Sequence, residues 1–254
     1  MSEKLLSVEN LTMKFGGLIA IDDLSFSAKK DQITSIIGPN GAGKTTVFNC
    51  LTGFYKATSG SMFLNKDNKS LDLKKFSDFK IAQKAGVART FQNIRLFPQM
   101  SVLENMMVAQ HNKLMMASGF SILGLINAPS FLKKEKEAKE ISKYWLDIIN
   151  LTNRADDNAG DLPYGDQRKL EIVRAMCIEP HLLCLDEPAA GLNAKESAEL
   201  NKLLKFIQKE KKTGILLIEH DMSVVMGISD HVVVLNYGKK IFEGTAKETK
   251  TSPE

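Results

Sequence analysis

The sequence has little cysteine, and the few thiols present exclude a disulfide framework or a thiolate metal cluster. Its 254 residues include three cysteines, and none stands at metal-ligand spacing from another. All three occur in apolar stretches, so we expect reduced thiols in the core of a cytoplasmic protein. They are Cys50, Cys177 and Cys184.

Long apolar runs are also missing, which argues against a membrane-spanning helix. The best candidate, residues 119–132, is too short and contains Pro129. The first four residues are not followed by a signal-peptide core. A net charge of +4 is too small to indicate nucleic acid or membrane by itself. We therefore expect a cytoplasmic globular protein whose membrane role, if any, depends on a partner.

The most informative segment is a glycine-rich run at residues 38–46, Gly-Pro-Asn-Gly-Ala-Gly-Lys-Thr-Thr. It fits G-x-x-x-x-G-K-[ST], a phosphate-binding loop. Residues 33–37 are predicted to form a buried strand and residues 45–51 a helix, which is the context this motif needs. Lys44 is expected at the β- and γ-phosphates and Thr45 at Mg²⁺. The alternative, a glycine-rich turn without a ligand, is disfavoured by the flanking strand and helix.

The remaining pattern predicts three regions. Residues 5–11 and 19–26 are expected to be strands joined by a turn at Gly16 and Gly17. Residues 101–150 are helical, starting with a capping box, and Trp145 lies on an apolar stripe typical of core packing. The last third alternates apolar strands with helices, which predicts a parallel sheet covered on both faces. The expected strands are 182–185, 215–218 and 232–235, and the expected helix is 193–212.

Polar residues follow two of these strands directly. Asp186 and Glu187 follow the strand at 182–185, and His220 follows the strand at 215–218. Ligands of such sheets bind beyond the carboxyl ends of the strands. Asp186 is expected to hold Mg²⁺ through water, Glu187 to polarise the attacking water, and His220 to contact the γ-phosphate. The alternative is that the carboxylates only cap the next helix.

With these residues together, the chain resembles the ATP-binding subunit of an ABC transporter. The resemblance covers nearly the whole chain. It implies that Phe15 stacks on adenine, that Gln92 links the Mg²⁺ site to the membrane subunits, and that Ala190–Asn193 lies at a dimer interface. By this resemblance and the loop motif, the ATP-binding residues are Phe15, Gly38, Pro39, Asn40, Gly41, Ala42, Gly43, Lys44, Thr45, Thr46 and Gln92. Catalysis is assigned to Lys44, Glu187 and His220, and Mg²⁺ to Thr45, Gln92 and Asp186.

The resemblance also sets the expected fold. It implies a P-loop NTPase with a mainly parallel core sheet, an N-terminal antiparallel β subdomain and a helical subdomain at about 93–160. Residues 1–254 are expected to form a single ABC ATPase domain with a short tail at 244–254. In that tail, Thr251, Ser252, Pro253 and Glu254 look like the start of a helix. A truncated end and a shortened variant both explain such an ending.

Within this family, the sequence most resembles the ATPase of branched-chain amino acid importers. The resemblance lies in residues 89–97, 163–165 and 187–193 and in an insert at about 113–136. This implies ATP and Mg²⁺ as cofactors, a second ATPase subunit in a homo- or heterodimer, two membrane permease subunits and an extracytoplasmic binding protein. It also implies a peripheral position on the cytoplasmic face of the inner membrane, with no nucleic-acid partner.

The family signature departs from its usual form here. Pro163, Tyr164, Gly165, Asp166 and Gln167 are expected to contact the partner's ATP, but Pro163 replaces a serine and Asp166 a glutamine. Pro163 offers no hydroxyl and no N–H, and Asp166 adds negative charge near phosphate. We therefore expect the ATP site that uses this signature to be the weaker of the two.

The sequence disfavours two other functions. A nucleic-acid- or ribosome-associated ATPase of the same fold usually has tandem units or long coiled-coil insertions, and this chain has neither. The chain also lacks a strongly basic patch. A GTPase or small-molecule kinase would draw on Asn65, Lys66, Asp67 and Asn68, but Asn68 stands where guanine recognition requires an aspartate.

Overall fold

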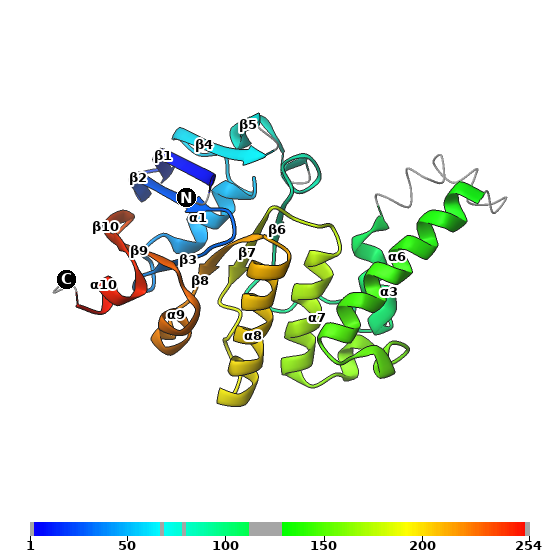
Figure 1. Ribbon diagram of the computed structural model, residues 1–254. Coiled ribbons are helices and arrows are strands. Elements are labelled where there is room, and N and C mark those ends of the chain that lie inside the picture. Colours follow the sequence, from blue (N-terminus) through cyan, green and yellow to red (C-terminus); the bar gives the residue numbers. More distant parts are fainter. Residues whose placement is uncertain (1–2, 67–68, 78–79, 112–128, 252–254) are drawn as a thin grey trace. The chain divides into compact units, whose positions relative to one another are not determined.

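The computed structural model describes residues 3–66, 69–77, 80–111 and 129–251. They form two compact units, Met1–Gln92 with Pro180–Glu254, and Asn93–Glu179. The chain thus leaves the first unit after Gln92, builds the second and returns (Figure 1).

The first unit contains a mainly parallel sheet that supports the predicted site. Its described strands number six, in the order β10-β9-β3-β8-β7-β6, and only the β9–β10 pair is antiparallel. Strands β3, β7 and β8 are buried at every residue, which explains their continuous apolar runs. The strands are β3 (Ile33–Ile37), β6 (Val87–Arg89), β7 (Leu182–Asp186), β8 (Gly214–Ile218), β9 (His231–Asn236) and β10 (Lys239–Gly244).

An antiparallel sheet of the same unit has the described strand order β2-β1-β4-β5. Its hairpin turns at Gly16 and Gly17, as the sequence predicts. Buried residues of both sheets belong to one hydrophobic core, which also takes Val47, Phe48 and Leu51 of helix α1. The strands are β1 (Lys4–Phe15), β2 (Leu18–Lys29), β4 (Ser59–Lys66) and β5 (Lys69–Asp72).

Helices α8 and α9 of this unit begin where the sequence provides a capping side chain. Helix α8 starts after Asn193, whose side chain forms a capping box with Glu196, so the predicted start is confirmed. Helix α9 starts after Asp221, which accepts a hydrogen bond from the Ser223 N–H. The described α-helices are α1 (Lys44–Leu51), α8 (Ala194–Glu210), α9 (Met222–Ile228) and α10 (Ala246–Thr251). A short 3₁₀-helix η1 (Leu73–Lys75) and a short π-helix η2 (Ile81–Ala85) accompany them.

The expected helix start at Thr251 is wrong. Thr251 is the last residue of α10, and Ser252, Pro253 and Glu254 lie outside the described residues. The helix starts six residues earlier because Glu248 accepts the Thr245 N–H at 2.7 Å, while the Glu248 N–H donates to the Thr245 hydroxyl at 3.3 Å. This reciprocal cap lies in the segment that the sequence predicts only as a tail.

The second unit is helical. Helix α3 packs against α6 and α7, and α3 begins with the predicted capping box of Ser101 and Glu104. Trp145 is buried, as its place on the apolar stripe predicts. The boundary of about 93–160 stays a prediction; the compact unit continues to Glu179. The elements are α3 (Val102–Ala109), α6 (Pro129–Ile148), α7 (Tyr164–Met176), η3 (Thr152–Arg154) and η4 (Ala159–Asp161).

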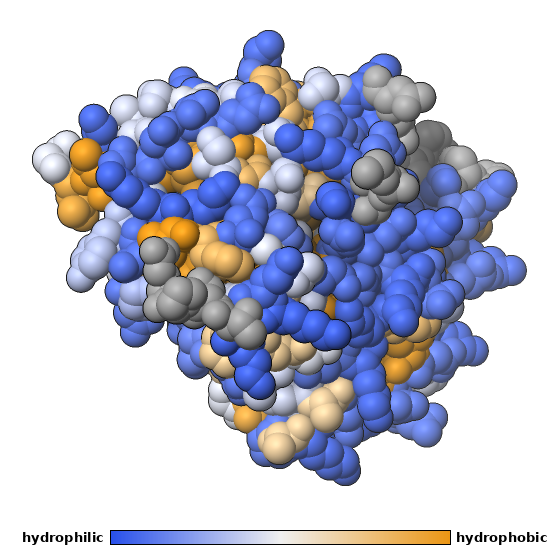
Figure 2. All heavy atoms as spheres, turned by 60° about the vertical axis from the view of Figure 1, so that its left-hand side comes forward, coloured by the Kyte–Doolittle hydropathy of each residue, from blue (hydrophilic) through white to orange (hydrophobic). Residues whose placement is uncertain are grey.

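The surface is mainly hydrophilic on the face in Figure 2, where hydrophobic residues form small separate areas. Among the described residues, no helix has the length and apolar character needed to cross a bilayer. The candidate run at 119–132 falls mostly outside those residues.

Candidate nucleotide-binding site

The polar residues predicted from the sequence gather at one edge of the parallel sheet. Strands β3, β8, β7 and β6 are neighbours, and Ile218 of β8 pairs with both Ile36 and Asp186. Arg89 of β6 pairs with Cys184 in β7. The residues that follow these strand ends therefore lie together, as expected for a ligand site of an α/β sheet.

The phosphate loop joins β3 to α1 and is packed closely from behind. Gly38 has φ +146°, and a Cβ there would lie 2.1 Å from the Leu235 carbonyl oxygen. Gly43 caps α1 at φ +97°, where a Cβ would lie 2.6 Å from the Ala20 carbonyl oxygen. Only glycine fits both positions. The other expected loop members are Pro39, Asn40, Gly41 and Thr45, which are exposed, Thr46, which is half-buried, and Ala42, which is buried.

Carbonyl groups of the phosphate loop hold the side chain of Lys44. Lys44 is only 7% exposed, and its Nζ donates to the carbonyl oxygens of Gly38 at 2.8 Å and Pro39 at 3.0 Å. The ammonium group is therefore fixed at the N-terminus of α1. Backbone N–H groups and a cation meet there, and this is the arrangement that binds phosphate.

Asp186 ends β7 and is buried beside an arginine. Its Oδ2 accepts from Arg89 Nη2 at 3.0 Å, and both side chains are nearly inaccessible to water. Burial raises the pKa of the Asp186 carboxyl, while the hydrogen bond and charge of Arg89 oppose that rise. Sequence reasoning missed Arg89; the signal available was a charged residue at the end of a short buried strand.

Glu187 directly follows Asp186, and its carboxylate lies close to Gln92 and His220. Gln92 Nε2 donates to Glu187 Oε2 at 2.8 Å, and His220 Nδ1 lies 3.7 Å from the same oxygen. Glu187 has φ +47°, a left-handed conformation that is costly for a non-glycine residue and is concentrated at functional sites. Its N–H donates to the Ile218 carbonyl at 2.9 Å, which fixes this conformation to β8.

Glu219 is a second residue that sequence reasoning passed over. It is fully buried, and its carboxylate accepts the N–H groups of Ala189 at 2.9 Å and His220 at 3.2 Å. Burial raises the pKa of this carboxyl. Glu219 thus ties the loop after Glu187 to the segment that carries His220. A charged residue directly after four apolar ones was the sequence signal.

Phe15, the expected adenine contact, ends β1 and is 41% exposed. Its ring meets Tyr55 edge-on, with centroids 5.1 Å apart. Tyr55 was not predicted from the sequence, because it lies forty residues further along the chain.

The signature lies in the second unit, at the start of α7. Pro163 is the N-cap of that helix and makes no side-chain cap hydrogen bond. Tyr164 is exposed, whereas Gly165 is buried. Asp166 pairs with Lys169 at 2.9 Å, and Gln167 Nε2 donates to the Leu162 carbonyl at 2.8 Å. The negative charge of Asp166 therefore has a partner within its own helix.

The donors fit Mg²⁺ in kind. The Thr45 hydroxyl, the Gln92 amide and the Asp186 carboxylate supply hard oxygen ligands. The described residues hold no group of three or more His, Cys, Asp or Glu side chains suited to a metal. Mg²⁺ that binds with a nucleotide usually takes several ligands from phosphate and water.

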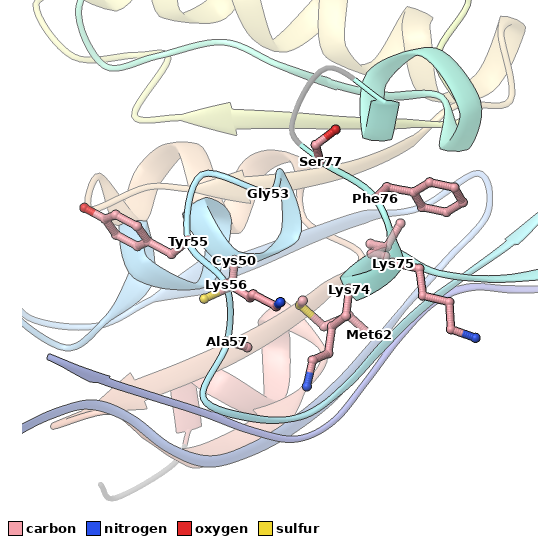
Figure 3. A pocket seen from close by; sticks show the side chains of 11 residues that line it. Cys50, Gly53, Tyr55, Lys56, Ala57, Met62, Lys74, Lys75, Phe76 and Ser77 are labelled. Carbon is pink, nitrogen blue, oxygen red and sulfur yellow. The ribbon is translucent and has the colours of Figure 1, made fainter.

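A separate cavity of about 340 Å³ lies beside the end of α1 (Figure 3). It contains none of the predicted site residues. The residues that line it are Cys50, Gly53, Tyr55, Lys56, Ala57, Met62, Leu73, Lys74, Lys75, Phe76 and Ser77.

Comparison with known proteins shows the family of the chain. Residues 21–190 match the family described as ABC transporter. The chain belongs to this family and is one of its nucleotide-binding ATPases. The expected fold class is confirmed by two solved ATP-binding cassettes of ABC transporters. A nucleotide-free cassette has a TM-score of 0.82 at 31% identity, covering 98% of this chain and 96% of that one. The ADP conformation of MJ1267 has a TM-score of 0.82 at 30% identity, covering 99% and 96%.

The curated relatives are more specific. The chain is 48% identical to BraF of Pseudomonas aeruginosa, a high-affinity branched-chain amino acid transport ATP-binding protein, over 100% of this chain and 96% of that protein. It has the same identity and coverage with LivG of Escherichia coli K12, which carries the same description.

Proposed function

We propose that the chain is the ATPase subunit of an importer for branched-chain amino acids. The observation that carries this proposal is the 48% identity to BraF and LivG along the whole chain. Relatives that match end to end and are described as transport proteins favour transport over a nucleic-acid-associated role. The guanine-recognition alternative includes Asp67 and Asn68, which lie outside the described residues, and it conflicts with family membership.

Within the site, we propose a role for each residue from the family resemblance and from its contacts. Lys44 and the backbone N–H groups of the loop at residues 38–46, Pro39 excepted, bind the phosphates, and Phe15 packs on the adenine. Glu187 orients and deprotonates the attacking water, and Gln92 fixes the Glu187 carboxylate. His220, whose Nδ1 lies 3.7 Å from Glu187 Oε2, contacts the γ-phosphate. Thr45, Gln92 and Asp186 would hold Mg²⁺, which neutralises phosphate charge when bound.

The partners follow from the same proposal. A second ATPase subunit would place its ATP against the Pro163–Gln167 signature, and two permease subunits would be driven by the pair. An extracytoplasmic binding protein would deliver the amino acid. The chain would then sit on the cytoplasmic face of the membrane as a peripheral subunit.

Uptake measurements test the proposal directly. In a strain that lacks this chain, uptake of radiolabelled leucine, isoleucine and valine should fall. The wild-type chain should restore it, and Lys44→Ala should not. Lys30→Ala, which changes an exposed lysine of the same unit, is the matched control and should restore uptake fully. Unchanged leucine uptake in the deletion strain would refute the cargo assignment.

The divergent signature leads to an asymmetry in a heterodimer. The ATP facing Pro163 and Asp166 should be hydrolysed more slowly than the ATP held by Lys44 and Glu187. A partner with an inactivated phosphate loop should therefore lower total hydrolysis less than Lys44→Ala in this chain does. Equal loss in the two cases would show that both sites matter equally.

A further inference from the structure

Arg89 is a charged residue in a place that offers it almost no water. It ends β6, three residues before Gln92, and its side chain is only 6% exposed. A buried guanidinium is expensive unless it is paired and hydrogen-bonded. Its partners therefore indicate what the position is for.

The two amino groups of Arg89 bind in different directions. Nη2 donates to Asp186 Oδ2 at 3.0 Å, at the end of β7. Nη1 donates to Asn49 Oδ1 at 2.6 Å and to Thr52 Oγ1 at 3.2 Å, at the C-terminal end of α1. The planar guanidinium thus bridges the predicted metal carboxylate and the helix that follows the phosphate loop. A lysine has one ammonium group and cannot reproduce this fork.

Three aromatic rings enclose the guanidinium. Its carbon lies 4.9 Å from the ring centroid of Phe91, 5.6 Å from that of Phe48 and 5.7 Å from that of Phe54. These distances suit cation–π attraction. The rings also keep water away from the Arg89–Asp186 pair, which strengthens the pair and fixes its geometry.

We infer that Arg89 is a positioning residue of the nucleotide site, which holds the Asp186 carboxylate in register with the phosphate-loop helix so that it can take up Mg²⁺ together with nucleotide. The inference rests on the proposed role of Asp186 as a metal ligand. Arg89 touches neither phosphate nor metal in this account; it acts through Asp186. Partners of this outer kind typically change metal affinity about 10–100-fold when they are removed.

Binding of a fluorescent, non-hydrolysable ATP analogue tests the inference without relying on turnover. The Kd is measured with Mg²⁺ and with EDTA for wild type, Arg89→Met, Arg89→Lys, Asp186→Asn and the Arg89→Met/Asp186→Asn double variant. Arg154→Met is the matched control, since Arg154 forms a local pair with Asp157 in the other unit. Thermal midpoints in EDTA report the folding of each variant.

Arg89→Met should leave the Kd in EDTA within about threefold of wild type. The factor by which Mg²⁺ lowers the Kd should be about tenfold smaller in Arg89→Met than in wild type. Arg89→Lys should lose part of that tightening. In the Asp186→Asn background, Arg89→Met should change nothing further, because the carboxylate it positions is gone. The double variant should also recover thermal stability relative to Arg89→Met, since no unpaired carboxylate remains buried.

The inference would be overturned if Arg89→Met weakened binding of the analogue equally in Mg²⁺ and in EDTA. It would also be overturned if Arg89→Met caused the same loss of affinity in the Asp186→Asn background. Full recovery by Arg89→Lys would show that charge alone suffices and would refute the bridging fork. If the wild-type chain shows no tightening with Mg²⁺, the proposed metal site fails and the inference falls with it. If wild type tightens and Arg89→Met tightens equally, only the positioning role fails.

Discussion

At the scale of single residues, the phosphate loop illustrates a limit of sequence motifs. The motif is recognised from the sequence, but the residues that pack against it are known only from the structure. The glycines of the loop are visible in the sequence. The surface behind them is supplied by Leu235 and Ala20, which are distant along the chain. The structural need for glycine at Gly38 is therefore partly tertiary.

Gly38→Ala should damage both stability and nucleotide binding. Its Cβ would lie 2.1 Å from the Leu235 carbonyl oxygen, at a φ that alanine rarely adopts. Overpacking of this kind costs about 1–3 kcal/mol, and the displaced loop should lose ATP affinity. Chemical denaturation and ATP titration measure the two effects. Gly17→Ala, with open space around its Cβ and no positive φ, should change neither by much; similar losses in both variants would contradict the packing argument.

We expect the buried thiols to react slowly with alkylating reagents. Burial raises the pKa of Cys50 to about 11 and that of Cys184 to about 12. At pH 8, roughly one Cys50 thiol in a thousand is then a thiolate, the reactive form. Alkylation of the native chain by iodoacetamide should be slow at pH 8 and speed up with rising pH, about tenfold per unit below pH 11. The urea-unfolded chain should react at least about 100-fold faster than the native chain. Mass spectrometry of the labelled peptides measures both rates, and fast labelling of native Cys50 would contradict its burial.

At the scale of elements, helix starts were readable because caps are local. The boxes at Ser101 and Asn193 each place two residues three apart, and the structure confirms both. The reciprocal cap at Thr245 and Glu248 is equally local, but it lies in the segment that the sequence analysis treats only as a tail.

Pro163 is an N-cap without a capping side chain, and this suggests a gain-of-function substitution. Pro163→Ser supplies a hydroxyl for the N–H groups of the first turn and for the partner's γ-phosphate. Stability should change little, because a cap worth about 1 kcal/mol is offset by the freer unfolded chain that loses a proline. ATPase activity of the self-paired chain should rise roughly tenfold, since a hydrogen bond to a charged group contributes about 1.5–3 kcal/mol.

Steady-state hydrolysis at high protein concentration measures this effect. Pro163→Ala removes the proline without adding a hydroxyl and serves as the control. Equal activity in the serine and alanine variants would mean that the hydroxyl does not matter in this signature.

At the scale of the whole molecule, the question is whether the chain pairs with itself. Glu187→Gln removes the proposed general base and should slow hydrolysis by about 100-fold or more, while Lys44 still binds the phosphates. With Na⁺ in place of Mg²⁺, we expect an ATP-dependent dimer in size-exclusion chromatography. The same variant with Lys44→Ala should stay monomeric, and Glu210→Gln, at an exposed helix end, should behave as wild type. An ATP-bound monomer of Glu187→Gln would instead indicate that a different ATPase subunit is required.

The sequence alone determined the features that depend on neighbours in the chain. The loop at residues 38–46, the apolar runs of β3, β7 and β8, and the carboxylates at the end of β7 all follow from short patterns. Helix periodicity also placed Trp145 in a core. The tertiary structure decided which distant residues meet. Gln92 reaches Glu187 across 95 positions, and Arg89 reaches Asp186 across 97. Parallel strands bring such residues to one sheet edge, and the register of the pairing, which no short pattern encodes, selects the partners.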